Sequence, residues 1–366
     1  MQDAIQNLLE ENKLDALLVS SNINNYYLLG YQTISPDDRD LWTLITKKNI
    51  YTFTHDLNFP LLQEHIQTVR FIPRLMNQKN PLTNQIAAII KKERVKTIGI
   101  EAEDLRFAEY QSFHKKISKS CAGLSWKKTK RLILSLRAIK NKKEIAHLRG
   151  AAHLADEALS EIVKTIRTGQ TEYEIARKIV AWFREKGCEP SFEPIVAIDQ
   201  NSAVPHYDSS LNKGRVKGGS LILIDYGVKY KGYCSDTTRV LFFGKASDEQ
   251  RNVYLKLLKA QEETIKAINQ FKKAKDLDLS CRSILKKLGV PENYPHVTGH
   301  GVGLQVHEAP SIHFRSKDRL QTNQVITIEP GIYVAGKYGM RIEDTVAIGE
   351  SSVEVLSRFP KSVQII

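Results

Sequence analysis

The first 127 residues alternate between helix-like and strand-like patterns. Apolar residues recur at helical spacing from Asp3 to Asn12 and in 82–93, whereas short β-rich runs fill 16–19, 42–46 and 97–103. Apolar positions three and four residues apart indicate an amphipathic helix, and short apolar runs between turn residues indicate buried strands. This alternation predicts a modest α/β domain, which we place at residues 1–127.

The rest of the chain, residues 128–366, combines longer helices with strand pairs. Helical periodicity runs through 141–169, with Gly169 as a plausible stop, and through 171–187, where Thr171 is the predicted N-cap. Two further helices are expected at 247–270 and 276–288. Each pair of helices precedes a strand pair that carries two carboxylates, which suggests one supersecondary unit used twice.

The first of these strand pairs lies at residues 220–243. An apolar β-rich run ends near Gly227, a polar link follows, and Gly232 opens a second run, which is a hairpin pattern with a link somewhat longer than the tightest turns. Asp225 and Asp236 are equidistant from the point between Tyr230 and Lys231. We therefore expect them opposite each other, where two like charges favour protonation unless a cation lies between them.

The second strand pair lies at residues 325–348 and repeats the arrangement. Glu329 and Glu343 are equidistant from Gly336, and Pro330 interrupts the strand pattern directly after Glu329. Arg341 precedes Glu343 by two residues and so shares its strand face. The second hairpin therefore offers another carboxylate pair with an arginine beside it.

Three histidines and three glycines fill the segment between the hairpins, residues 294–310. A lone histidine is more often a hydrogen-bonded structural residue than a metal ligand, but three within twelve residues, near four spaced carboxylates, favour a site. We predict His300 as the metal ligand and His296 and His307 as polar groups over the substrate. The interleaved glycines would let backbone approach a ligand or metal closely. A set of four carboxylates and one imidazole suits hard to borderline divalent ions.

Composition fits an ordinary enzyme of two domains. The chain has 366 residues, 42% hydrophobic and 26% charged, and no apolar run of the length a membrane helix needs. No signal-peptide pattern is evident at the N-terminus, and the four cysteines are far apart, so we expect free thiols and a cytoplasmic protein. The net charge of +13 is densest between Lys115 and Lys143. Without a nucleic-acid motif, this segment is better interpreted as a solvated linker and helix face than as a nucleic-acid site.

These residues together resemble the pita-bread metallopeptidases, which include methionine aminopeptidase, Xaa-Pro aminopeptidase, prolidase and creatinase. The matching segments appear in the family's order, with all five metal positions present: 201–207, 225–239, 298–310, 327–333 and 340–345. The N-terminal part matches more loosely, through 15–32. The resemblance implies an α+β fold, in which a pita-bread catalytic domain with helices outside a curved antiparallel sheet follows a smaller creatinase-like domain.

The resemblance also implies a role for each site residue. The metal ligands would be Asp225, Asp236, His300, Glu329 and Glu343, holding two divalent ions, with manganese preferred and cobalt, iron or zinc as alternatives. The ions would activate a bridging water, and Glu329, His206 and His307 would be catalytic. The substrate-binding residues would be His296, Arg341 and Tyr207, with Arg341 paired to a ligand carboxylate or to a substrate group. A homodimer is expected, with no nucleic-acid or membrane partner.

The proline-directed branch of the family fits best, through residues 205–207 and 306–310. We expect an aminopeptidase that removes the N-terminal residue from peptides with proline second, with prolidase, which cleaves Xaa-Pro dipeptides, as the alternative. Ser311 stands where several prolidases carry a carboxylate-binding arginine, although Arg315 or a partner subunit could supply that charge. Asp199 is an unusual carboxylate in its loop, and we expect it to face solvent rather than to bind the substrate amine.

Two alternatives lie outside peptidase chemistry. Creatinase has this fold but acts without metals and lacks the full ligand set. Non-catalytic binding proteins on the same fold usually lose ligands, whereas all five positions are present here. Both alternatives predict little bound metal, so metal analysis separates them from the peptidase.

Overall fold

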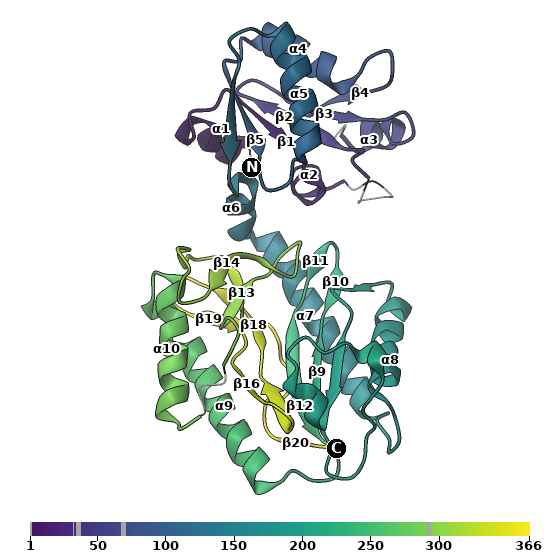
Figure 1. Cartoon of the computed structure of the whole chain (residues 1–366), viewed down its shortest axis with the longest axis vertical. Coiled ribbons are helices and arrows are strands. Elements are labelled where there is room, and N and C mark those ends of the chain that lie inside the picture. The colour runs from purple at the N-terminus through teal and green to yellow at the C-terminus, as the bar shows by residue number, and fades with distance from the viewer. Residues whose placement is uncertain (1, 32, 34–37, 67–70, 291–293) are drawn as a thin grey trace. The chain divides into compact units, whose positions relative to one another are not determined.

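The chain divides into two compact units, Met1–Arg137 and Ala138–Ile366, in the computed structural model (Figure 1). The structure describes residues 2–31, 33, 38–66, 71–290 and 294–366. Among them, no helix is both long and apolar enough to cross a membrane. All four cysteines are free thiols, as expected.

The N-terminal unit is a six-stranded mixed sheet with helices, in the spatial order β4-β3-β2-β1-β5-β6. Its strands are β1 (Ala16–Val19), β2 (Trp42–Thr46), β3 (Ile50–Thr54), β4 (Phe71–Leu75), β5 (Thr97–Glu101) and β6 (Ser125–Thr129). Its helices are α1 (Gln2–Glu11), α2 (Asn22–Leu29), α3 (Phe59–Ile66), α4 (Leu82–Glu93), α5 (Phe107–Ser120) and α6 (Leu132–Ala138). The helix predicted at 82–93 from its periodicity is α4, which has the same bounds. Two apolar clusters form the cores of the unit, and Ile98 and Ile45 are fully buried in them.

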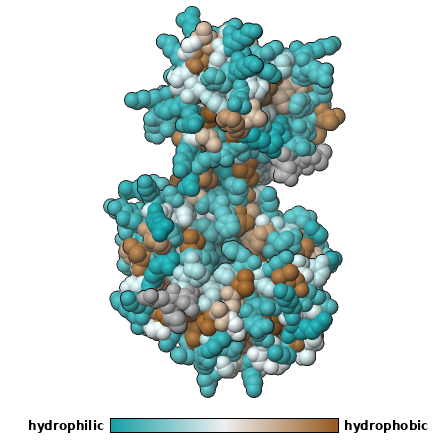
Figure 2. All heavy atoms as spheres, in the orientation of Figure 1, coloured by the Kyte–Doolittle hydropathy of each residue, from teal (hydrophilic) through white to brown (hydrophobic). Residues whose placement is uncertain are grey.

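Part of the basic segment between Lys115 and Lys143 forms the edge strand of this sheet. β6 pairs only with β5 and ends the sheet, and Lys127 and Lys128 on it are exposed. Charged side chains on an edge strand hinder its pairing with a second molecule. On the face drawn in Figure 2, hydrophilic residues dominate the surface of each unit, with apolar residues scattered among them.

The second unit packs mainly antiparallel sheets between helices, with one parallel pair, β12 and β20. Figure 1 shows α7 (Lys142–Val163) and α8 (Glu172–Glu185) on one side of the strands, with α9 (Asp248–Ala267) and α10 (Ala274–Lys287) on the other. A four-stranded sheet has the order β20-β12-β9-β8, and a five-stranded sheet has the order β14-β13-β15-β18-β19. Their strands are β8 (Ile195–Ile198), β9 (Leu221–Tyr226), β12 (Thr237–Phe242), β13 (Gly299–Gly301), β14 (Glu308–Ile312), β15 (Val325–Ile328), β18 (Asp344–Ile348), β19 (Val353–Val355) and β20 (Gln364–Ile365).

Shorter elements complete this unit. Two small sheets contain β7 (Glu189–Pro190), β10 (Val228–Tyr230) and β11 (Tyr233–Cys234) in one, and β16 (Gly331–Val334) and β17 (Tyr338–Arg341) in the other. Three 3₁₀ helices are η1 (Asp199–Ala203), η2 (Ser209–Leu211) and η3 (Ile268–Gln270). Thr171 caps α8 as predicted, with its side chain accepting from the Glu174 N–H. The α7 helix ends at Val163, before the expected stop at Gly169. Just after the end of the helix, the Thr165 hydroxyl donates to the Ile162 carbonyl.

Candidate metal centre

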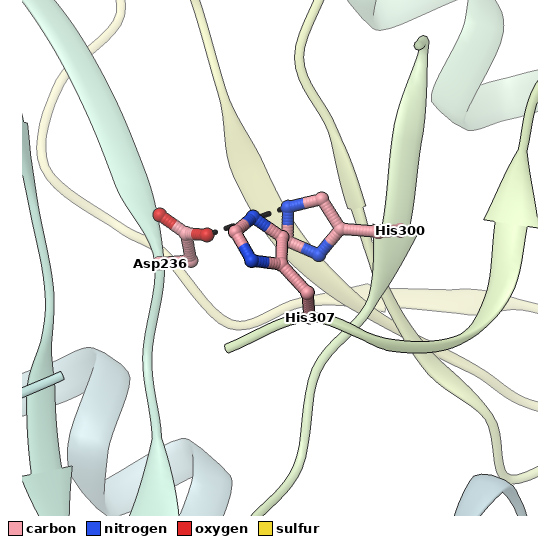
Figure 3. A group of neighbouring side chains, drawn as sticks. All are labelled: Asp236, His300 and His307. Carbon is pink, nitrogen blue, oxygen red and sulfur yellow. Dashed lines mark ion pairs between the residues drawn. The ribbon is translucent and has the colours of Figure 1, made fainter. Parts of the chain in front are cut away.

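The five predicted ligands converge on one cluster from five separate places in the second unit. Three overlapping groups each bring their ligand atoms within 4.8 Å of one another: Asp225, Asp236 and Glu343; His300, Glu329 and Glu343; and Asp236, His300 and His307. The shared members Glu343, His300 and Asp236 join the groups. The structure therefore brings the five predicted side chains together, and it adds His307 to the cluster (Figure 3).

The first hairpin has a different register from the one expected. Asp225 faces Thr238, not Asp236, and the same register continues through Tyr230 opposite Tyr233. The connection is a tight two-residue turn, Lys231-Gly232, with φ of 49° and 85°. Positive φ at both positions is typical of a type I′ turn. The hairpin is thus centred one residue later than predicted, which shifts the pairing by two and leaves both aspartates on the same face.

The second hairpin has the predicted register. Ile328 faces Asp344 on one side of the carboxylates and Gly331 faces Arg341 on the other, so Glu329 and Glu343 occupy opposite positions. Their backbone N–H groups bond to neighbouring segments instead of to each other. Glu329 donates to the Thr298 carbonyl at 2.9 Å and Glu343 to the Thr238 carbonyl at 3.2 Å. The two strands separate at this point. As a result, the histidine segment bonds to Glu329 and the first hairpin bonds to Glu343.

His300 is oriented as a metal ligand would be. Its Nδ1 lies 3.1 Å from the Gly301 carbonyl, so the hydrogen-bond geometry assigns the proton to Nδ1 and leaves Nε2 as an acceptor. Nε2 lies 3.5 Å from Asp236 Oδ2 and 3.4 Å from Glu329 Oε1. Burial lowers the pKa of His300 to about 3, with a further contribution from His307, so the imidazole is neutral. The rings of His300 and His307 lie 4.4 Å apart (Figure 3).

The glycines around His300 allow close strand packing. A Cβ on Gly299 would lie 1.9 Å from the Thr327 carbonyl oxygen, and one on Gly301 would lie 2.1 Å from that of Ala309. β13 is therefore held between β14 and β15 at a distance that leaves no room for a side chain at these two positions. Close approach of their backbone to a ligand, the role expected for them, stays a prediction.

The cluster is electrostatically incomplete without a cation. Burial raises the pKa of Asp225, and burial together with repulsion from neighbouring carboxylates raises the pKa of Asp236 and Glu343 well above the usual range. Burial also raises the pKa of Glu329 to about 7. Among the described side chains, Asp225 Oδ1 is buried without a hydrogen-bond partner. A buried carboxylate oxygen without a partner, inside a set of oxygen and neutral imidazole donors, fits a divalent ion.

Arg341 donates hydrogen bonds to three side chains in and around this cluster. Its Nη2 donates to Asp225 Oδ2 at 2.5 Å, and its Nε donates to Thr238 Oγ1, which in turn donates to Glu343 Oε2 at 2.7 Å. Its Nη1 donates to the Tyr333 hydroxyl at 2.7 Å. Of the two roles expected for Arg341, pairing with a ligand carboxylate is the one seen in these contacts.

His296 lies at the far end of the Arg341 chain of hydrogen bonds. Its Nε2 is 3.0 Å from the Tyr333 hydroxyl, and its Nδ1 is 2.8 Å from the Val297 carbonyl and 3.8 Å from Glu329 Oε2. Burial lowers the pKa of His296 to about 3, so this ring is also neutral. His296 thus borders Glu329 from the side opposite His300.

His206 and Tyr207 lie in different surroundings although they are adjacent in sequence. His206 is exposed and interacts electrostatically with Asp225, His296 and His307, which places it at the cluster. The Tyr207 hydroxyl donates to Glu172 Oε2 at 2.7 Å, at the start of α8. The structure therefore brings His206 to the metal ligands and anchors Tyr207 against the helix.

Asp199 is partly exposed, with 33% of its side-chain surface accessible, and it also has a structural role. Its carboxylate accepts from the Leu221 N–H at 2.9 Å and from the Ser220 hydroxyl at 3.2 Å, and its φ is 51°. It therefore fixes the start of β9, the strand that carries Asp225. Asp and Asn tolerate this left-handed conformation better than most residues.

Sequence reasoning missed several residues that support the ligands. Thr238 and Tyr333 carry the bonds from Arg341, and the buried Arg239 donates to the Glu343 carbonyl and to Asp344 Oδ1. Thr238 lies two residues after Asp236 and shares its face, so period-two spacing was a usable signal. No comparable local signal marks Tyr333 or Arg239, because their partners are distant in sequence.

Comparisons with known proteins agree with this geometry. The model of metallopeptidase family M24 matches residues 146–350, and that of the creatinase/prolidase N-terminal domain matches residues 2–139. The chain belongs to metallopeptidase family M24. The predicted recognition, the two-domain pita-bread fold and the assignment as a metallopeptidase are therefore confirmed.

Several relatives of this M24 metallopeptidase carry proline-directed names. An Xaa-Pro dipeptidase of Pyrococcus furiosus is 32% identical over 351 residues, covering 96% of this chain and 95% of that protein. The structure of an Xaa-Pro dipeptidase from Bacillus anthracis has a TM-score of 0.91 at 29% identity, covering 100% and 99%. That of an X-Pro aminopeptidase from Thermotoga maritima has a TM-score of 0.85 at 29% identity, covering 98% and 100%. These names favour the dipeptidase alternative over the aminopeptidase that we expected first.

Proposed function

We propose that this M24 metallopeptidase is a two-metal prolidase that hydrolyses Xaa-Pro dipeptides. The observation that carries the proposal is the convergence of four carboxylates and His300, whose ligand atoms meet within 4.8 Å in overlapping groups. The relatives named Xaa-Pro dipeptidase supply the substrate class. An Xaa-Pro bond is a tertiary amide without an N–H, so a dedicated peptidase is needed to cleave it.

We further propose that the cluster holds two divalent ions, preferably manganese. Asp225, Asp236, His300, Glu329 and Glu343 would together hold the two ions. An oxygen-rich set with one imidazole supports manganese, and it leaves cobalt, iron and zinc as competitors. Bound ions would lower the pKa of a coordinated water and polarise the peptide carbonyl.

The remaining polar residues are assigned to substrate and proton handling. Glu329 accepts the proton of the attacking water, since its carboxylate lies within the cluster, 3.4 Å from His300 Nε2. His206 and His307, both exposed beside the cluster, donate hydrogen bonds to the substrate and to the oxyanion. His296 lines the same pocket next to Glu329. Arg341 orients Asp225, and Tyr207 holds the His206 segment through its bond to Glu172.

A second candidate function is the aminopeptidase expected from the sequence. Ser311, where several prolidases have an arginine, lies opposite His300 in the strand register and donates its backbone N–H to Asp318. A serine cannot hold the free carboxylate of a dipeptide as an arginine does. The Thermotoga maritima neighbour, titled an X-Pro aminopeptidase, also supports this candidate. We propose a homodimer for either activity.

The experiment compares three substrates with manganese-loaded protein: an Xaa-Pro dipeptide, the matching Xaa-Pro-Yaa tripeptide and a Met-Ala-Yaa control. Faster cleavage of the dipeptide supports the prolidase, and faster cleavage of the tripeptide replaces it with the aminopeptidase. If neither proline substrate is cleaved while two ions are bound, the specificity proposal fails and the metal centre alone remains. Light scattering on the same preparation tests the dimer.

A further inference from the structure

In a short basic segment outside the metal centre, residues 213–217, exposed side chains alternate with less exposed positions. Lys213, Arg215 and Lys217 are exposed, whereas Val216 is buried in the apolar core and Gly214 packs against Glu172. The segment is held against residues 169–172 by bonds between Gly169 and Val216, and between Val216 and Gln170. Successive side chains of an extended chain point to opposite sides, so the three cations share one side.

These cations line a cavity of about 510 Å³, together with η1 and the turn between β16 and β17. Lys337 from that turn adds a fourth cation, and Gly219 and Gly336 contribute backbone to the wall. Asp199 is the one carboxylate among the described residues that line it. Four cations against one carboxylate leave the cavity with three net positive charges.

The contacts already made by these charges neutralise them only in part. Asp199 accepts from the Leu221 N–H and the Ser220 hydroxyl, and Lys217 Nζ lies 3.8 Å from it. Arg215 interacts electrostatically with Glu174 and uses one of its five N–H donors on the Gly169 carbonyl. Like charges that line one concave site raise each other's energy, and a bound anion relieves the repulsion.

We propose that this cavity binds a small anion with two or more phosphate groups. The net charge of the lining matches a di- or triphosphate better than a single carboxylate or phosphate. The volume falls within the range of small-molecule sites, roughly 300–1,000 Å³, and exceeds what one phosphate fills. Guanidinium and ammonium groups form strong charge-assisted hydrogen bonds to phosphate oxygens. None of the lining residues belongs to the metal cluster, so the proposal is independent of the peptidase assignment.

The test is calorimetric titration of the full chain with orthophosphate, pyrophosphate and tripolyphosphate at constant ionic strength. We expect affinity to rise in that order. K213S/K217S should weaken tripolyphosphate binding at least tenfold, whereas the matched charge change K266S/K272S, at exposed lysines elsewhere in the same unit, should alter it less than twofold. Both variants keep the metal centre, so phosphate binding at that centre cancels in the comparison.

Further arms identify the source of the phosphates and the ways the proposal fails. ATP binding tighter than tripolyphosphate assigns the site to a nucleotide, and equal binding assigns it to the phosphate chain alone. Equal weakening by both double variants would reduce the effect to general surface charge and overturn the site. Single-stranded DNA that binds more tightly per phosphate than tripolyphosphate would also overturn it in favour of a macromolecule. Wild-type peptidase activity and thermal midpoint in K213S/K217S establish that its fold is intact.

Discussion

At the scale of single residues, the metal cluster is a set of acids held where their charges repel. Asp236 and Glu343 are buried and have raised pKa values, and Arg341 is the cation that the contacts place beside them. The residue types and their spacing predicted these side chains as one set, and the structure brings their ligand atoms together, whereas their binding of two ions stays a prediction. The hydrogen-bond partners that orient these side chains could not be predicted from local sequence patterns.

Glu329 should make the metal-free protein less stable as pH rises from about 4.5 to about 7. Burial raises the pKa of Glu329 from 4.5 to about 7, so between these values this carboxyl group binds more protons in the folded state than in the unfolded state. Its contribution to the free energy of unfolding then falls with increasing pH, whereas the lowered pKa values of His296 and His300 make theirs rise. The measurement is the thermal midpoint in EDTA across this range.

Two comparisons isolate the cause of that pH dependence. Glu329→Gln removes the titrating group, so from pH 4.5 to 7 its metal-free midpoint should fall less, or rise more, than that of the wild type. Manganese should stabilise the wild type more at higher pH, because ions displace protons from the ligands and bind more tightly there. The same pH dependence in Glu329→Gln and in the wild type would contradict the electrostatic account.

Replacing His307 or His206 should lower turnover without removing metal. Each ring is exposed at the cluster, and loss of one transition-state hydrogen-bond donor costs roughly 100-fold in kcat. His307→Ala and His206→Ala remove the donor and should retain the wild-type metal content by elemental analysis. His307 also lies within reach of Asp236 and His300, so a parallel loss of metal in His307→Ala would make it a ligand instead.

At the scale of elements, helices and hairpins were predictable where local chemistry decides them. Caps such as Thr171 mark helix ends, and the register of the second hairpin follows from the symmetry of its carboxylates about Gly336. The first hairpin was centred one residue too early, because the tight turn depends on positive φ at Lys231 as well as at Gly232. An error of one residue in the centre moves the pairing by two, so both aspartates kept the correct face.

Gly227→Ala should disrupt the first hairpin and its aspartates. A Cβ there would lie 2.0 Å from the Ser235 carbonyl oxygen, which is backbone directly before Asp236. Overpacking of this kind costs about 1–3 kcal/mol and shifts the strand. We expect a lower unfolding free energy and weaker manganese binding. Gly218→Ala is the control, since nothing lies within 4 Å of its Cβ. Unchanged metal affinity in Gly227→Ala would exclude this role.

A buried ion pair connects the segment before α7 to the residue that follows His307. Lys140 Nζ lies 3.5 Å from Glu308 Oε2, and both side chains are 1% exposed. Removing one partner of a buried pair costs about 3–5 kcal/mol, so Lys140→Met should lower the free energy of unfolding by that amount. The exposed pair of Arg149 and Glu354 is the control, and Arg149→Met should cost less than about 1 kcal/mol. Equal effects in chemical denaturation would refute the distinction.

At the scale of the whole molecule, all the candidate metal ligands lie in the second of the two units. The N-terminal unit has its own apolar clusters, and the second unit holds separate clusters around the ligand strands. Length and pattern were enough to predict two domains. The ion pair between Lys140 and Glu308 was not predictable, because its two residues are 168 positions apart and neither belongs to a local pattern.

Calorimetry of the full chain should resolve two unfolding transitions, of which only one responds to manganese. An ion that binds the folded state alone stabilises the unit that holds its ligands, by about 2.7 kcal/mol at one hundred times the dissociation constant. Ile98→Ala, in the buried core of the N-terminal unit, should lower the other transition, since such truncations cost about 2–5 kcal/mol. A single transition that moves with both manganese and Ile98→Ala would instead make the two units one cooperative structure.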